Sequence, residues 1–262
     1  MNAAEIAPPV GETELPGSEV ELPGGGRALF TDRSHGNMSS VGGKEAEGGL
    51  AARERLRERC GIAALVRGYQ VHGTVVGCVY VDGARRGTPA GADDLADARR
   101  LSDGPLQPSF RADGHACAAE GVAAMVLAAD CLPVVLGARG AVAALHAGWR
   151  GLAAGVLEEG VRALREVGGS GDVVAVLGPC AGRCCYEVGE EVHAAFVAEG
   201  PDARAGRNLD LKAIARRQLG RAGVEEVHDP GLCTICSDPS LFFSHRRDHG
   251  VTGRQAGIAW LS

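Results

Sequence analysis

Long apolar runs and an export signal are both absent from this sequence of 262 residues. No apolar stretch approaches the ~18 residues that a membrane-spanning helix needs, so we expect no membrane contact. No Lys or Arg precedes Arg27, and a secretory signal requires a basic start followed by an apolar segment. The nine cysteines are odd in number, so we expect reduced thiols in a cytoplasmic protein rather than a disulfide scaffold.

A basic surplus is also lacking, because the formal net charge is −6 and the pI is ≈ 5.8. The charge therefore favours neither nucleic acid nor an acidic lipid surface, and no sequence feature indicates an obligate protein partner. The phosphate-loop, nucleophile-elbow and HExxH motifs do not occur. With three methionines and no HxH pair, the sequence also disfavours copper centres of the multicopper-oxidase kind.

The segments that are present predict one layered domain of the α+β class, with mixed β-sheets flanked by helices, over residues 27–262. Residues 1–26, rich in Pro and Glu, predict a disordered acidic tail, and the Gly-, Pro- and Asp-rich residues 83–111 predict a loop insertion. Hydrophobic patterning predicts strands at 27–31, within 64–81, within 121–148, at 172–179 and at 255–262. It predicts helices at 49–60, 151–167, 187–199 and 210–222, the last with Asp210 as its N-cap.

Three metal-ligating residue types interrupt apolar, strand-like segments: His72, Cys131 and His146. Each lies at or near a predicted strand end, where a turn can direct the side chain into a shared cleft. Two imidazoles and one thiolate suit zinc and leave a fourth position for water or substrate. Their spacing is not that of a zinc finger, so the residue types alone favour a buried cysteine with two hydrogen-bonded turn histidines.

Arginines gather at two places that suit an anion. Arg150 follows Trp149 in a Gly-rich turn before a predicted helix, and such a helix start offers free N–H groups to phosphate or carboxylate. Arg246, Arg247 and Arg254 lie together in "SHRRDHGVTGR". The alternative for both groups is a set of solvated surface arginines, and for Trp149 it is ordinary core packing.

The remaining cysteine pattern is Cys233-x-x-Cys236, which resembles half of a zinc ribbon. Cys184 and Cys185 could supply the other half, but no second CxxC with ribbon spacing exists, so this interpretation is disfavoured. We expect these cysteines to be free thiols.

Seven short blocks together resemble one known family. They are "LFTDRSHGNMS", "QVHG", "ADCLPV", "HAGWRG", "GPCAGRCCYEVG", "NLDL" and "CTICSDPSLFFSHRRDHGVTGRQ". The likeness, from about residue 28 to the C-terminus, is to the YfiH-type laccase-domain family, also called polyphenol oxidase-like proteins or peptidoglycan editing factors. It implies a cytoplasmic zinc enzyme that phosphorolyses adenosine, inosine, guanosine and methylthioadenosine, with adenosine deamination beside it.

The resemblance also implies site residues. The family's metal ligands correspond to His72, Cys131 and His146, so we expect one zinc per chain, with copper the less favoured metal. Arg33 corresponds to an arginine of the family's loop motif "TTR-x-GG-x-S", from which this chain departs at His35 and Asn37. Asp130, beside the cysteine ligand, is a candidate proton donor or a support for a metal-bound histidine.

Two other activities stay open alongside the phosphorylase. One is a copper-dependent polyphenol oxidase of the laccase type, which the family's older name suggests. The other is a hydrolase that edits peptidoglycan precursors. The sequence does not rank substrates among the purine nucleosides and does not give the oligomeric state.

Overall fold

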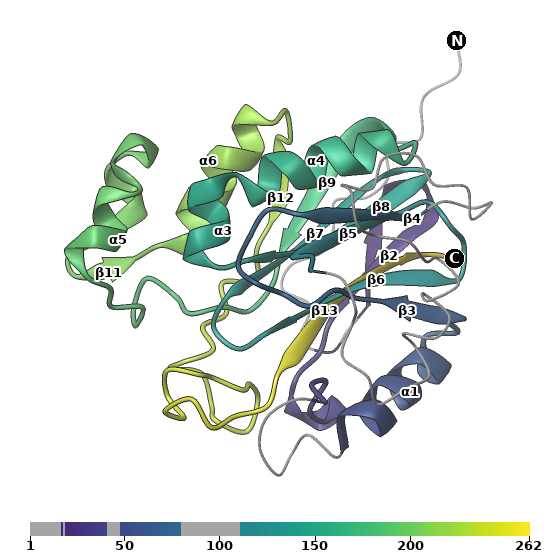
Figure 1. Ribbon diagram of the computed structural model, residues 1–262, viewed down its shortest axis with the longest axis horizontal. Coiled ribbons are helices and arrows are strands. Elements are labelled where there is room, and N and C mark those ends of the chain that lie inside the picture. Colours follow the sequence, from purple (N-terminus) through teal and green to yellow (C-terminus); the bar gives the residue numbers. More distant parts are fainter. Residues whose placement is uncertain (1–16, 18, 41–47, 80–110) are drawn as a thin grey trace.

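The structure of the chain is a computed structural model that describes residues 17, 19–40, 48–79 and 111–262 (Figure 1). Two stacked β-sheets form its centre. The larger has six strands in the order β12-β9-β7-β8-β5-β4. Their bounds are β12 Glu226–His228, β9 Ser170–Leu177, β7 Leu132–Arg139, β8 Ala141–Ala147, β5 Gly114–Cys117 and β4 Val76–Val79. The sheet is mixed, because β7 and β8 are antiparallel while β4 runs parallel to β5.

The smaller sheet has five strands in the order β1-β2-β13-β6-β3. Their bounds are β1 Glu19–Leu22, β2 Gly26–Phe30, β13 Gln255–Leu261, β6 Val122–Ala128 and β3 Ala64–Val66. The C-terminal strand β13 lies at the centre, between β2 and β6. A separate two-stranded ribbon joins β10 (Arg204–Ala205) to β11 (Asn208–Leu209).

Side-chain alternation along the strands explains why the sheets stack. In β7, Val135 belongs to the apolar cluster between the sheets, whereas Val134 and Leu136 belong to the cluster on the opposite face. In β13, Ala259 faces the other sheet and Ile258 faces outward. Successive side chains of a strand point to opposite faces, so strands that are apolar on both faces must be covered on both.

Helices supply the outer layers. The six-stranded sheet is covered by α3 (Trp149–Ala154), α4 (Val156–Glu166) and α6 (Leu211–Arg221), and the five-stranded sheet by α1 (Gly49–Arg59). Figure 1 shows the resulting order of helices, sheet, sheet and helix. The predicted α+β architecture is confirmed. Among the helices of the described residues, none is long and apolar enough to cross a bilayer.

Several element predictions hold and others need correction. The helix expected at 151–167 is two helices, because Gly155 has a left-handed φ of 90° between α3 and α4. It also begins earlier, so that Trp149 and Arg150 form the first turn of α3. The Asp210 carboxylate caps α6 as expected, accepting hydrogen bonds from the N–H groups of Lys212 and Ala213. The segment at 187–199 contains the short α5, Glu190–Ala194, and a 3₁₀ turn at Val197–Glu199 in place of one continuous helix.

The boundaries at both predicted irregular segments also change. The tail expected over residues 1–26 ends sooner, because residues 19–22 pair with β2 as the edge strand β1. Residues 1–16 and 18, and residues 83–110 of the expected insertion, lie outside the described residues. The strands predicted within 64–81 are present, but β3 and β4 belong to different sheets.

Candidate metal centre and active-site cleft

The three predicted metal ligands come from separate segments that converge at one end of the larger sheet. His72 lies in the loop between β3 and β4, Cys131 directly precedes β7, and His146 is the penultimate residue of β8. β7 and β8 are antiparallel neighbours, and Leu132 pairs with Ala147, so the cysteine lies next to the end of β8. The topology of the sheet therefore brings together residues that the sequence separates.

The side chains themselves form a compact N₂S donor set. The ligating atoms of His72, Cys131 and His146 all lie within 4.8 Å of one another. Cys131 Sγ is 3.7 Å from His72 Nε2, and the two imidazole rings meet edge to face with centroids 4.8 Å apart. Zinc takes nitrogen ligands at about 2.0–2.1 Å and sulfur at about 2.3 Å. Donors at these separations fit around one such ion.

Asp113 organises two of the three ligands, and the sequence analysis did not single it out. Its carboxylate contacts His146 Nδ1 at 2.9 Å and accepts the backbone N–H groups of Val71, His72 and Gly73 at 2.8–3.1 Å. The bond to Nδ1 leaves Nε2 of His146 for a metal, and the three N–H bonds hold the loop that presents His72, whose φ is +61°. An aspartate beside a glycine, as in "RADGHAC", resembles an ordinary turn residue and gives little signal.

The electrostatics of the cluster favour a thiolate. Burial raises the pKa of the Cys131 thiol, but the neighbouring His146 and His72 outweigh burial and lower the pKa to about 6. Burial lowers the pKa of His146, and the Cys131 thiolate and Asp113 together outweigh that effect and raise it to about 9. A thiolate is the form of cysteine that binds metal, so this environment prepares Cys131 for ligation.

Gly148 allows the cluster to close. A Cβ atom at position 148 would lie 2.9 Å from His72 Cδ2 and 3.0 Å from Cys131 Sγ. Real Cβ atoms essentially never approach a neighbour as closely as the first distance, and the second is tighter than most of their contacts. The glycine of "HAGW" is thus required by the close approach of the backbone to two candidate ligands.

The cluster opens into a cleft of ≈ 380 Å³, which is within the usual size range of small-molecule sites. Besides the three ligands, the side chains that matter most in its lining are Arg67, Tyr69, His245 and Arg254. Among the described residues, none forms a hydrogen bond with the Arg67 guanidinium. The Tyr69 side chain is 46% exposed. Neither Arg67 nor Tyr69 was a sequence-predicted site residue.

Of the five arginines predicted to bind substrate, the structure brings Arg254 into the cleft. Burial lowers the pKa of this arginine, while the nearby Cys131 and Asp130 oppose that shift. Its Nη1 donates to the carbonyls of Thr252 and Gly253 at 3.0 and 2.8 Å. Among the described residues, none accepts a hydrogen bond from the remaining N–H groups of the guanidinium, which leaves them for an anion.

Arg33 and Arg247 are engaged elsewhere. Arg33 lies 3.2 Å from the Asp248 carboxylate and stacks over Phe243, and Arg247 donates to Asp248 and to the carbonyls of Phe242 and Thr234. These contacts join the N-terminal and C-terminal loops, and the two arginines do not line the cleft.

Arg246 and Arg150 also lie outside the cleft lining. Arg246 donates to the Glu187 carbonyl at 2.8 Å and lies over the Tyr186 ring. Arg150 is exposed and stacks on Trp149, with its guanidinium carbon 4.3 Å from the ring centroid. The turn at 146–150 therefore joins the candidate ligand His146 to an exposed arginine that stacks on the half-buried Trp149.

Asp130 makes contacts unlike those expected for a histidine support. Its carboxylate accepts the Thr234 hydroxyl and the Arg246 backbone N–H, each at 2.6 Å. The carboxylate that contacts a ligand histidine is Asp113. Asp130, with a φ of 87°, instead connects the Cys131 turn to the loop that carries Thr234 and Arg246.

A mixed α+β domain with a histidine–cysteine cluster at the mouth of a cleft is the class that the fold and site define. The family model described as multi-copper polyphenol oxidoreductase laccase matches residues 28–262, and the chain belongs to that family. The resemblance inferred from the short sequence blocks is confirmed.

Curated relatives extend over most of the chain. A Xylella fastidiosa (strain Temecula1) protein named purine nucleoside phosphorylase is 37% identical, covering 98% of this chain and 95% of its own. The Escherichia coli (strain K12) protein named purine nucleoside phosphorylase YfiH is 40% identical over 63% of this chain and 70% of its own.

Solved structures of the same fold also match. YlmD from Geobacillus stearothermophilus has a TM-score of 0.77 at 27% identity and covers 97% of this chain and 99% of its own. A Neisseria meningitidis protein has a TM-score of 0.72 at 32% identity, covering 92% of this chain and 96% of its own.

Proposed function

We propose that the chain is a zinc-dependent purine nucleoside phosphorylase that acts on adenosine, inosine, guanosine and methylthioadenosine and also deaminates adenosine. The observation that carries the proposal is the opening of the N₂S cluster into a cleft that also presents Arg67 and Arg254. The names of the relatives from Xylella and Escherichia coli support the nucleoside and phosphate as substrates.

The cleft offers a separate place for each part of the reaction. Arg67 and Arg254 are two partly buried cations on its lining, suited to hold inorganic phosphate by charge-assisted hydrogen bonds. Tyr69 is an exposed ring on which a purine can stack. In phosphorolysis an oxygen of phosphate bonds to the anomeric carbon, the bond to the purine nitrogen breaks, and the purine takes up a proton.

His72, Cys131 and His146 would hold zinc, which supplies Lewis-acid stabilisation of the charge that develops in the reaction. Asp113 fixes His146 by its contact with Nδ1 and fixes the His72 loop by three backbone hydrogen bonds. Positioning of this kind lowers the cost of bringing reacting groups together, because the side chains are already oriented before substrate binds.

The ligand inventory favours this function over a multicopper oxidase. Among the described residues, only two groups of three or more potential ligands lie close together, and one of them contains no histidine. The imidazoles that a multicopper centre requires are therefore not gathered in that part of the chain.

The decisive experiment combines metal analysis with a phosphate-dependent assay. We expect zinc in the purified protein and release of free base from nucleosides only when phosphate is present, with ammonia released from adenosine in parallel. Cys131→Ala is the matched variant, since it removes a ligand without changing Arg67 or Arg254. Copper with oxidation of phenols, or hydrolysis of muropeptide precursors without nucleoside cleavage, would contradict the proposal.

A further inference from the structure

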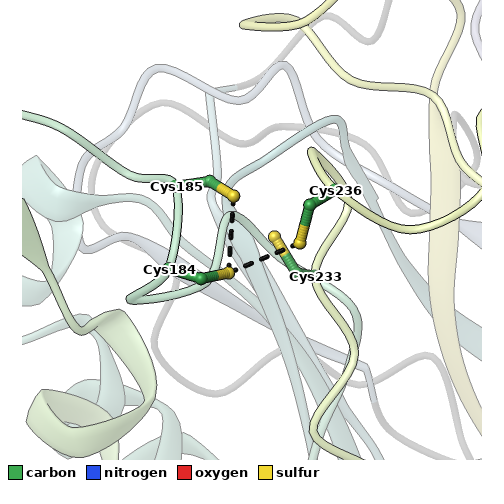
Figure 2. Close-up of side chains that lie close together, drawn as sticks. All are labelled: Cys184, Cys185, Cys233 and Cys236. Carbon is green, nitrogen blue, oxygen red and sulfur yellow. Dashed lines mark hydrogen bonds between the residues drawn. The ribbon is translucent and has the colours of Figure 1, made fainter.

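Four cysteines from two distant segments meet in a second cluster, apart from the cleft ligands. Cys184 and Cys185 lie in the loop between β9 and α5, and Cys233 and Cys236 lie in the loop after β12. All four sulfur atoms are within 4.8 Å of one another. Figure 2 shows the side chains pointing from the two loops toward a common centre.

We propose that Cys184, Cys185, Cys233 and Cys236 bind one zinc ion in a closed structural site, separate from the candidate ligands of the cleft. Four thiolates arranged tetrahedrally are a ligand set that zinc takes in structural sites. The sequence analysis disfavoured this pairing because the first pair lacks CxxC spacing. In the structure, adjacent cysteines fill the place of the missing motif.

The sulfur separations match such a site. Cys184 Sγ is 3.5 Å from Cys236 Sγ and 3.4 Å from Cys185 Sγ. With zinc–sulfur bonds of about 2.3 Å, the edge of a regular tetrahedron is about 3.8 Å. A disulfide would require about 2.05 Å, so the cysteines are free thiols, as predicted, at separations close to those of a metal's ligands.

The backbone around Cys233 is arranged for a negatively charged sulfur. The Gly182 N–H donates to Cys233 Sγ at 3.3 Å, and the N–H groups of Ile235 and Cys236 also point to it. Several thiolates gathered at one point repel one another, and a bound dication removes that repulsion.

Gly182 makes the approach of the loops possible. A Cβ atom at position 182 would lie 3.1 Å from Cys233 Cβ and 3.2 Å from Cys184 Sγ. A larger residue would push one loop away from the other. The glycine therefore fits a site in which both loops supply ligands.

The two loops have few other regular connections. A single β-bridge joins Cys180 to Cys233, with the Thr234 N–H donating to the Cys180 carbonyl at 2.9 Å. A metal that cross-links Cys184 to Cys236 would fix the start of the segment 233–254. In that segment, the Thr234 hydroxyl donates a hydrogen bond to Asp130, and His245 and Arg254 line the cleft. The role of the site is thus structural, holding the loop that completes the cleft wall.

Metal stoichiometry tests the proposal. We expect two zinc ions per chain in the wild type, one in Cys131→Ala and one in the double variant Cys233→Ser/Cys236→Ser. Cys60→Ser, which changes a cysteine at the end of α1, is the matched control and should keep two. Equal zinc contents in the wild type and the double variant, or iron in place of zinc, would overturn the assignment.

A second measurement does not depend on the double variant folding. In Cys131→Ala, cobalt added in place of zinc should give the thiolate-to-metal charge-transfer absorption of a four-sulfur site. The four cysteines should resist a thiol reagent until a chelator is added. A disulfide found within the cluster by mass spectrometry, or reactivity unchanged by the chelator, would overturn the proposal. A wild-type protein that binds two zinc ions but does not phosphorolyse nucleosides would count against the proposed function alone.

Discussion

Cys131 lies against the strands of the six-stranded sheet, whereas Cys184, Cys185, Cys233 and Cys236 lie in loops. The first cluster has mixed nitrogen and sulfur donors, a buried carboxylate behind it and an open cleft in front. The second has only sulfur donors, from two loops that the β-bridge between Cys180 and Cys233 joins.

This difference shows what fixes the positions of the donor atoms in each cluster. The sheet fixes His146 and Cys131 through backbone hydrogen bonds between β7 and β8, so these residues are positioned before any metal binds. Loops lack that ladder, and side-chain contacts must hold them instead. Zinc sites that serve structure are closed and those that serve catalysis keep an open position, which matches this division.

Loss of the cleft thiolate should give the largest effect. Cys131→Ala removes one of three ligands, so we expect the zinc of the cleft to be lost and phosphorolysis to fall by more than about 100-fold, beyond the range of changes behind a ligand. Steady-state kinetics and elemental analysis on the same preparation measure both quantities. Cys60→Ala serves as the control and should retain both. Full activity in the zinc-depleted variant would show that the cluster is not the metal centre of the enzyme.

The second-largest effect should come from a change at Asp113, whose carboxylate supports the candidate ligands His146 and His72. Asp113→Asn weakens the contact with His146 Nδ1 and the bonds to the His72 loop, so zinc affinity or activity should fall about 10–100-fold. Competition with a chelator measures the affinity. Asp130→Asn is the matched comparison, since Asp130 contacts Thr234 and Arg246 and no ligand histidine. A larger loss of zinc affinity in Asp130→Asn than in Asp113→Asn would reverse the assignment.

The contrast between these two aspartates illustrates what the sequence could predict. His72, Cys131 and His146 stand out because polar residues rarely interrupt apolar strands without a reason. Asp113 acts through contacts with segments some 33 and 40 residues away, which no local pattern encodes. The strand pattern likewise gave β2, β9 and β13, but not the assignment of β3 and β4 to different sheets. Register and sheet membership depend on tertiary packing.

The loop-borne cluster was harder to predict for the same reason. Spacing rules for zinc ribbons assume two short CxxC turns, and the pair at 184–185 does not follow them. The strand β1 was missed because Glu and Pro dominate the composition of its segment. Its pairing with β2 and the burial of Leu22 between the sheets stabilise it despite that composition.

A smaller effect should separate two candidate anion-binding arginines. Arg254 lines the cleft, and Arg150 does not, although the sequence analysis gave both as candidate anion ligands. A charge-assisted hydrogen bond contributes about 1.5–3 kcal/mol, so Arg254→Ala should raise the KM for phosphate about tenfold or more. Arg150→Ala should change it by less than about twofold, because its guanidinium stacks on Trp149 in solvent. Titration of phosphate at saturating nucleoside distinguishes them, and the opposite ranking would favour Arg150 as the anion ligand.

The smallest effect on activity should fall on a change at Asp248, whose carboxylate joins Arg33 of the N-terminal loop to Arg247 and Thr252 of the C-terminal loop. Hydrogen bonds from Arg247 and Thr252, outweighing burial, lower the pKa of its carboxyl from 3.8 to about 2. A carboxyl with a depressed pKa stabilises the fold fully above its unfolded value, and this contribution disappears as the pH falls through about 2. Because the carboxyl is partly exposed, solvent screening reduces the contribution of this shift to stability to about 1 kcal/mol at neutral pH.

Asp248→Asn should therefore lower the free energy of unfolding by about 1 kcal/mol at pH 7 and flatten its dependence on pH between about 4 and 2. Denaturant unfolding across that range measures both changes. Asp238→Asn is the control, because Asp238 lies in the same segment, but among the described residues its carboxylate accepts hydrogen bonds only from nearby Ser240. If the loop is held chiefly by the four cysteines, the two variants will have equal stabilities and the same acid dependence. If Asp248 shares that role with the metal, only Asp248→Asn will lose stability, because its carboxylate joins Arg33 from the N-terminal region to Arg247 in the cysteine-bearing segment.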